Sequence, residues 1–76
     1  MTPYKNMNGN SNVEAYELGE GSITVRFMSG RHRNYLYDSV RPGASVVARM
    51  QALAQQGHGL NSYISTTVKS SFSKKW

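Results

Sequence analysis

Two neighbouring segments of the chain alternate between apolar and polar residues, and a Ser29-Gly30 step separates them. The first segment covers residues 22–28 and the second covers residues 31–37. A period of two residues is typical of strands with one buried face, and a small residue followed by glycine favours a turn. The pattern therefore predicts an antiparallel hairpin. Its clearest apolar face consists of Ile23, Val25 and Phe27.

A further strand is predicted before this hairpin, at residues 12–18, with a glycine-rich turn at residues 19–21. Glycine adopts positive φ without a steric penalty, which suits a tight connection between adjacent strands. The alternation in this strand is irregular. It places Val13 and Ala15 on one face and Tyr16 on or near the other, together with Leu18. The three segments together predict a three-stranded antiparallel meander.

Apolar residues in the next segment, residues 44–56, recur at helical spacing. The stripe consists of Val46, Val47, Met50, Leu53 and Ala54. This spacing is typical of an amphipathic helix, and Gly57 suits a left-handed position just after its last turn. Pro42 lies before the helix and breaks the sheet, because proline cannot join a central ladder. A second, shorter helix is predicted at residues 60–68.

These elements predict one α+β domain at residues 12–68, in the order β-β-β-α-α. The meander is covered on one face by one long and one short helix, because the apolar stripe must be buried against another element. The polar segment 1–11 is predicted to be a flexible arm, in which Tyr4 is the only sizeable anchor and either packs on the body or stays free. Segment 69–76 is predicted to be a basic tail. The tail is either disordered, or its Phe72 and Trp76 fold back onto the body or onto a second subunit.

Several short motifs follow one another in this domain. They are Ser11-Asn12-Val13, Ile23-Thr-Val-Arg-Phe27, Ser29-Gly30, Tyr35-Leu36-Tyr37, Val40 and Gly59-Leu60-Asn61-Ser-Tyr63-Ile64. In their order and spacing, over about residues 11–68, the chain resembles the KTSC domain. That small family is named after the C-terminal extension of some lysyl-tRNA synthetases and also includes free-standing bacterial and phage proteins. Its hallmark is a central Tyr-x-Tyr. The resemblance implies the fold described above and a role in RNA binding.

Basic residues outnumber acidic ones, with nine Lys and Arg against four Asp and Glu and a formal net charge of +5. All four acids lie between Glu14 and Asp38. A basic excess favours a polyanionic partner, although solubility alone also explains a basic surface. The residues predicted to contact nucleic acid are Arg26, Arg31, Arg33, Tyr35, Tyr37, Arg41, Lys69, Lys74 and Lys75.

Tyr35 and Tyr37 lie two residues apart on one predicted strand, so they share a face. One interpretation is a platform for stacked bases, with Arg31 and Arg33 on the same side to contact phosphates. The other is that both rings face the helix and fill the core. The opposite face of the strand would make a poor core, so we expect at least one tyrosine to be structural. Arg26 then lies on the open sheet face.

The composition argues against most enzyme and metal-binding classes. The chain has no cysteine, and neither His32 nor His58 has an acid at a metal-ligand spacing. A domain this thin is not expected to hold a pocket of about 300 Å³ or more. We therefore expect no catalytic residue, no cofactor and no metal. The sequence has no apolar run typical of a signal peptide or a membrane span, which favours a cytoplasmic protein.

We therefore expect a small non-enzymatic binding module. The leading hypothesis is nucleic-acid binding, RNA before DNA, through a basic sheet surface and the basic tail. The alternative is a protein-interaction factor that docks on an acidic surface of a larger host enzyme or assembly, as small phage proteins do. A third hypothesis is a homodimer formed through the free edge of the first or the third predicted strand.

Overall fold

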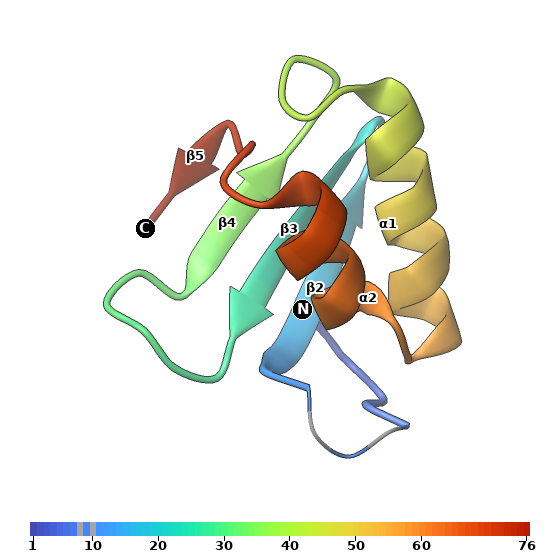
Figure 1. Cartoon of the computed structure of the whole chain (residues 1–76), viewed down its shortest axis with the longest axis vertical. Helices are drawn as coiled ribbons and strands as arrows, with labels where there is room; N and C mark the ends of the chain where they lie inside the picture. The colour runs from blue at the N-terminus through green and yellow to red at the C-terminus, as the bar shows by residue number, and fades with distance from the viewer. Residues whose placement is uncertain (8, 10) are drawn as a thin grey trace.

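The computed structural model describes residues 1–7, 9 and 11–76 and has an α+β architecture. Within these residues, a five-stranded antiparallel sheet follows chain order from β1 to β5, and Figure 1 labels β2 to β5. The strands are β1 (Thr2–Pro3), β2 (Val13–Gly19), β3 (Ser22–Phe27), β4 (Asn34–Tyr37) and β5 (Lys74–Lys75). The predicted meander is confirmed as the three central strands. Each of its edges carries an additional two-residue strand that periodicity did not reveal.

The central hairpin has shorter strands and a longer loop than predicted. β4 begins only at Asn34, so residues 28–33 form the β3–β4 loop. Ile23 pairs with Tyr37 in the ladder, and the pairing ends where Arg26 meets Asn34. Beyond that point the Phe27 N–H donates to the carbonyl of Arg33, the last residue of the loop, at 2.8 Å. The loop therefore projects beyond the sheet with Arg31 near its tip.

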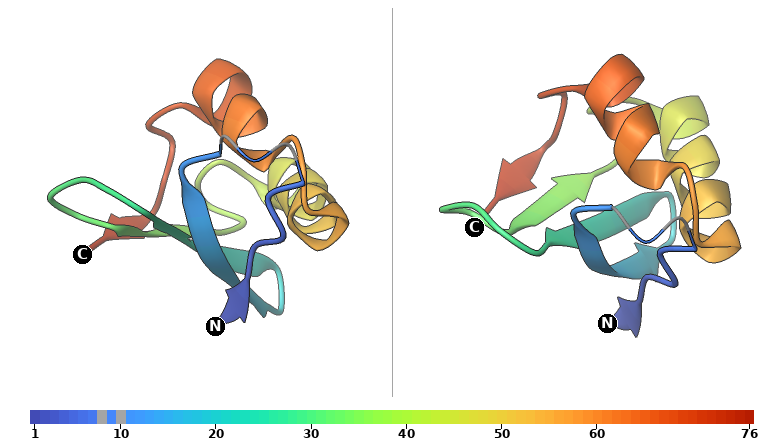
Figure 2. Two further views of the ribbon diagram at one scale, coloured as in Figure 1. Left: turned by 90° about the horizontal axis from the view of Figure 1, so that it is seen from below. Right: turned by 60° about the horizontal axis from the view of Figure 1, so that its bottom comes forward.

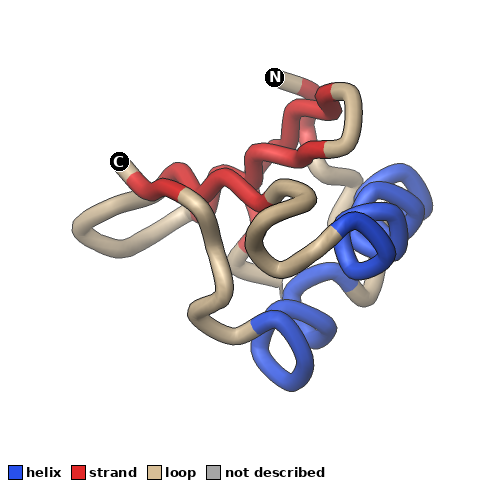
Figure 3. Tube along the Cα trace, turned by 90° about the horizontal axis from the view of Figure 1, so that it is seen from above, coloured by secondary structure: helices blue, strands red, loops and turns tan. Residues whose placement is uncertain are grey.

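The long helix α1 spans Ala44–Gln56, as predicted, and ends at Gly57, whose φ of 81° is left-handed. The second helical segment begins as α2 (Leu60–Tyr63) and continues as the π-helix η1 (Ile64–Val68). The helix α1 and the segment formed by α2 and η1 lie on the same side of the sheet (Figures 2 and 3). In the described part of the chain, no helix is long and apolar enough to cross a bilayer.

The hydrophobic core lies between this helical layer and the sheet. Its largest fully buried side chains are Val13, Ile23, Val25, Tyr37, Val47, Met50 and Leu60. Members from both layers belong to one cluster, so the predicted packing of the α1 stripe on the sheet is confirmed. Full burial of one large aliphatic side chain contributes about 1.5–3 kcal/mol. This packing is therefore the main source of stability for a domain with few residues.

A β-bulge in β2 explains the irregular alternation of that strand. The register against β3 shifts between Val13 and Ala15, so Glu14 is an extra residue in the ladder. Val13 and Tyr16 consequently both belong to the core cluster, whereas Ala15 is buried outside it. The expectation that Val13 shares a face with Ala15 and not with Tyr16 is wrong, because the extra residue shifts the alternation by one position.

The N-terminal segment is part of the fold in the residues that the structure describes. β1 pairs antiparallel with β2, and the ring of Tyr4 is buried with 6% exposure. The Tyr4 hydroxyl accepts a hydrogen bond from the Leu60 N–H at 3.3 Å. The prediction of a flexible arm at residues 1–11 is therefore wrong for this part. Asn8 and Asn10, which belong to the same predicted arm, lie outside the described residues.

The C-terminal segment also belongs to the sheet. Tyr35 of β4 pairs with Lys75 of β5. The Trp76 N–H donates to the Asn34 carbonyl at 2.9 Å, and the Asn34 N–H donates back to the Trp76 carbonyl at 3.0 Å. Of the alternatives for segment 69–76, the structure has the one in which the tail folds back onto the body, because the exposed edge of β4 offers its backbone groups as partners.

The same two short strands bear on the predicted homodimer. β1 pairs with β2 at Ala15 and Tyr16, and β5 pairs with β4 at Tyr35 and Leu36. The outer edges of the first and third predicted strands are thus partly paired within the chain. The homodimer through an edge of these strands stays a prediction, and the short strands narrow the backbone that is open to it.

Candidate functional site

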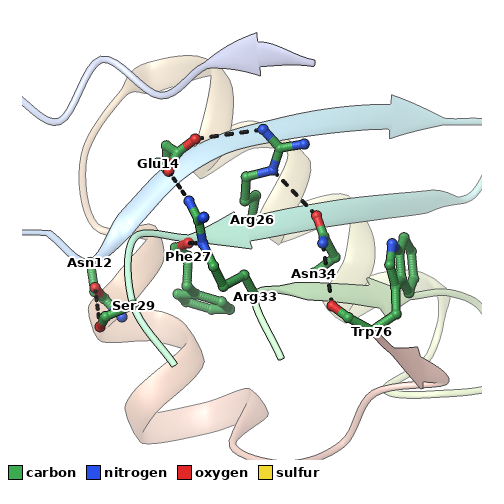
Figure 4. A network of polar contacts seen from close by, with 8 residues as sticks. All are labelled: Asn12, Glu14, Arg26, Phe27, Ser29, Arg33, Asn34 and Trp76. Carbon is green, nitrogen blue, oxygen red and sulfur yellow. Dashed lines mark hydrogen bonds and ion pairs between the residues drawn. The ribbon is translucent and has the colours of Figure 1, made fainter. Parts of the chain in front are cut away.

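The sheet face opposite the helices carries two arginines around one carboxylate (Figure 4). The Arg26 guanidinium lies 3.5 Å from the Glu14 carboxylate, and the Arg33 guanidinium donates to the other oxygen of that group. Arg26 also donates from Nε to Asn34 Oδ1 at 3.4 Å. Side chains alternate along β3, so Arg26 points away from the core that buries Val25.

This network changes the role of two predicted phosphate contacts. Arg33 was expected on the same side as Tyr35, but it belongs to the β3–β4 loop, where its Nε donates to the Phe27 carbonyl at 2.9 Å. Its guanidinium reaches Glu14 on the outer face, so that expectation is wrong. One carboxylate partly neutralises both Arg33 and Arg26, and the open face is less positive than the arginine count suggests.

A groove of about 520 Å³ lies on the other, helix-covered side of the sheet. It runs between the β3–β4 loop and the chain that leads from η1 to β5, two segments that can be followed in Figure 2. Its lining residues are Asn12, Phe27, Ser29, Gly30, Arg31, His32, Tyr35, Tyr37, Ile64, Lys69, Ser70, Phe72 and Lys75. The groove is larger than expected for a thin domain, because the folded tail supplies a second wall.

Aromatic rings form the wall of this groove. Tyr35 is half-buried and lies between two other rings, in edge-to-face contact with each. The ring centroids of Phe27 and Tyr35 are 5.4 Å apart, and those of Tyr35 and Phe72 are 4.9 Å apart. All three rings are partly exposed and pack against the core cluster. The wall is thus a fixed aromatic surface with accessible area.

Cationic side chains border the same groove. Arg31 comes from the β3–β4 loop, Lys69 follows η1, and Lys75 lies in β5; all three are exposed. The Lys75 Nζ is 5.6 Å from the centroid of the Phe72 ring, a cation–π distance that holds the ammonium at the groove. Among the residues described as lining the groove, none is acidic. The groove therefore combines aromatic surface with uncompensated positive charge.

The two predicted tyrosines differ in their roles. Tyr37 is 1% exposed and belongs to the core, so it cannot stack on a base, and its assignment as a contact residue is wrong. The expectation that at least one tyrosine is structural is confirmed. Burial, with a smaller contribution from Tyr35, raises the pKa of the Tyr37 hydroxyl above its ordinary value of 10.0. The neutral hydroxyl is the form that suits the core.

The remaining predicted contacts lie away from the groove. Arg41 is exposed in the loop between β4 and α1, where its backbone N–H donates to Asp38 Oδ1 at 3.1 Å. Lys74 pairs with Leu36 in the ladder, so it points to the outer face when its neighbour Lys75 points to the groove. The structure thus brings together Arg31, Tyr35, Lys69 and Lys75, and separates Arg26, Arg33, Arg41 and Lys74 from them.

Two groove residues, Phe27 and Phe72, were not predicted as contacts. Phe27 was assigned to the core because it continues the apolar face of β3, and it lies at the end of that face. For Phe72 the expectation was docking on the body or on a second subunit, as one alternative to a disordered tail, and not contact with nucleic acid. A signal for Phe72 was present: an aromatic residue in a Ser- and Lys-rich segment brings a large apolar surface that is favourable to bury.

The polar side chains around the groove include one histidine and two serines. In the described part of the chain, no group of three or more His, Cys, Asp or Glu side chains could hold a metal ion. His32 lines the groove, and no carboxylate is among the lining residues that would pair with it. The hydroxyls of Ser29 and Ser70 add hydrogen-bonding groups at its border. No family model, curated protein or solved structure matches this chain.

Proposed function

We propose that this chain is a small binding module for nucleic acid, RNA before DNA, and that the groove is its contact surface. One observation carries the proposal: exposed Arg31, Lys69 and Lys75 surround a wall of partly exposed aromatic rings, with no acid among the lining residues. Cations recognise the phosphate backbone, and aromatic rings stack with bases at about 1–3 kcal/mol per base.

RNA is preferred over DNA for two reasons. The chain resembles the KTSC domain, for which an RNA-binding role is implied, and that membership remains a prediction. The groove also has short polar side chains, Asn12, Ser29 and Ser70, near its cations. Such groups hydrogen-bond readily to a ribose 2′-hydroxyl, which DNA lacks.

The salt dependence of binding tests the proposal directly. Three phosphate contacts on a single strand give a slope of about −2 for the logarithm of affinity against that of salt concentration. Affinity for mixed-sequence RNA should therefore fall by about 20-fold between about 50 and 200 mM salt. Fluorescence anisotropy with labelled RNA measures this. Absence of binding even at the lowest salt would overturn the proposal.

A pair of charge-matched double variants locates the contact surface. Arg31→Ser with Lys75→Ser removes two groove cations, and the slope should then fall to about −0.7. Arg41→Ser with Arg49→Ser removes two exposed cations that do not line the groove. The second variant lowers net charge equally and should nearly keep the wild-type slope. Equal effects of the two variants would show nonspecific attraction to a basic protein.

The alternative partner, an acidic protein surface, would use the same cations but has no bases to stack. If the partner is such a surface, the affinity for an acidic polypeptide should equal or exceed the affinity for an RNA of the same net charge. An RNA affinity that survives an excess of polyglutamate separates the two partners. Loss of RNA binding under that competition would favour the protein-interaction role.

A further inference from the structure

Lys69 has a backbone conformation that is unusual for a residue with a side chain. Its φ is 55° and its ψ is −124°. The Ser71 N–H donates to the Val68 carbonyl at 3.1 Å, so residues 68–71 close a four-residue turn with Lys69 in the first central position. These dihedral angles are those of a type II′ turn, in which the first central position is normally glycine.

A positive φ strains the backbone of a residue with a side chain, and such strain is not a general feature of this chain. Among the described residues with positive φ, only Asn6 and Lys69 are not glycine, and asparagine tolerates that region well. The described part of the chain has glycine at six other such positions. A strained non-glycine residue persists where its side chain or its setting has a use, and such residues cluster at ligand sites. A lysine at a position that suits glycine therefore points to a use for its charged side chain.

The setting of Lys69 is the groove. It directly follows the π-helix η1, a rare element that is frequent at functional sites, and its N–H donates to the carbonyl of Ile64. The turn then leads to Phe72, which packs against Tyr35. Strained backbone, π-helix and aromatic contact thus meet at one border of the groove. The turn that aims the Lys69 side chain also builds the aromatic wall.

The shape of the groove limits the kind of nucleic acid that it accepts. A volume of about 520 Å³ is in the size class of sites for single small ligands. Phe27, Tyr35 and Phe72 line the groove and are partly exposed, and a base can stack on such a ring only if its own face is free. In a duplex the base faces are covered by their neighbours, and RNA readers accordingly target unpaired loops, bulges and ends.

We propose that the groove binds an unpaired nucleotide, whose base stacks on one ring of the Phe72–Tyr35 pair and whose phosphate is held by Lys69. This inference rests on the proposed function and adds to it a ligand class, unpaired RNA, and a dedicated phosphate-binding residue. Arg31 on the opposite border contacts an adjacent phosphate, so the strand runs between the β3–β4 loop and the turn.

Three single variants of the full chain test this assignment. Lys69→Gln removes the charge and keeps the side chain, whereas Lys69→Gly removes both the charge and the strain. Lys74→Gln is the matched control, because Lys74 lies on the outer face. The probes are a labelled oligouridine of about five nucleotides and a blunt RNA duplex of similar length without unpaired residues. Affinity is measured by anisotropy and Tm by thermal unfolding.

The wild type should bind the oligouridine at least about tenfold more tightly than the duplex. Lys69→Gln and Lys69→Gly should each weaken oligouridine binding by about fivefold at about 0.1 M salt, the effect of one phosphate contact. Lys74→Gln should change it by less than about twofold. Lys69→Gly should also raise Tm by about 4 °C relative to Lys69→Gln, so that weaker binding accompanies a more stable fold.

Two results would overturn the inference and leave the proposed function intact. One is equal affinity of the wild type for duplex and oligouridine, and the other is equal oligouridine affinity of Lys69→Gln and Lys74→Gln. If the wild type binds neither probe at low salt, both the inference and the proposed function fail. The wild-type measurement therefore distinguishes the two failures.

Discussion

Phe72 packs edge-on against Tyr35, with ring centroids 4.9 Å apart and an interplanar angle of 81°. This contact joins the last segment of the chain to the third strand of the central meander. Phe72 also lies beneath the ammonium of Lys75, at 5.6 Å. One aromatic pair thus completes the groove wall and positions a cation beside it.

Replacing Phe72 by alanine should weaken RNA binding by about tenfold, because one stacking surface worth about 1–3 kcal/mol is lost. The free energy of unfolding should fall by only about 1–2 kcal/mol, because the ring is half-buried and loses an aromatic pair. Urea denaturation and anisotropy give the two values. Trp76→Ala is the control, since Trp76 pairs with Asn34 and lies with Arg26 on the outer face (Figure 4). Equal losses of affinity in both variants would contradict the assignment of the groove.

Replacing Glu14 by glutamine frees Arg26 and Arg33 from their shared carboxylate. These side chains are 38–45% exposed, so the ion pairs should stabilise the fold by less than about 1 kcal/mol. RNA affinity should rise by less than about threefold, because the two arginines do not line the groove. The urea midpoint and the anisotropy titration test this. A rise of about tenfold or more would identify the outer sheet face as the RNA surface.

Acid should reduce the stability of the wild type more than that of Asp38→Asn. The backbone N–H of Arg41, and to a smaller extent the Ser73 hydroxyl and the Val40 N–H, lower the pKa of Asp38 below its ordinary value of 3.8. A carboxyl with a depressed pKa in the folded state stabilises the fold above its unfolded pKa. That contribution is lost as pH falls through the pKa that Asp38 has in the folded state. Urea midpoints of the two proteins should therefore converge below pH 3.8; a constant difference would contradict this origin.

Alkali should destabilise the wild type through Tyr37. Burial raises the pKa of this hydroxyl in the folded state, so the proton is released more easily after unfolding. The contribution of the neutral Tyr37 hydroxyl to the free energy of unfolding is fully present below the ordinary pKa of 10.0, and it decreases progressively as pH rises above that value. Tyr37→Phe should match the wild type near neutral pH and lose less stability above pH 10.0. Parallel pH profiles of the two proteins would show that Tyr37 ionises freely in the fold.

The central elements of the fold could be predicted because their patterns are local. Alternation indicates the buried face of the strand that contains Ile23, Val25 and Phe27, and helical spacing indicates the buried face of α1. The bulge at Glu14 could be suspected only from a failure of alternation, since its position depends on the register of β3. The helix at residues 60–68 was found by spacing, but its change to a π-helix was not.

The binding surface was predicted only in part, because it depends on which segments meet. Arg31, Tyr35, Lys69 and Lys75 were named from their residue types and do line one groove. Arg33 has the same chemistry and is only two residues from Arg31, yet it pairs with Glu14 on the other face. Composition counts both arginines equally, whereas the loop geometry directs them to opposite sides of the sheet.

The sequence by itself determined a basic α+β domain with a central meander and an apolar helix stripe. These features are encoded in the period of apolar residues along short segments. Only the tertiary structure decided that the two ends of the chain form edge strands, and that Phe72 joins Tyr35 in a groove. Two-residue strands have no period, and their pairing comes from backbone groups that any residue can present. Contacts between distant segments depend on the folded surface that receives them.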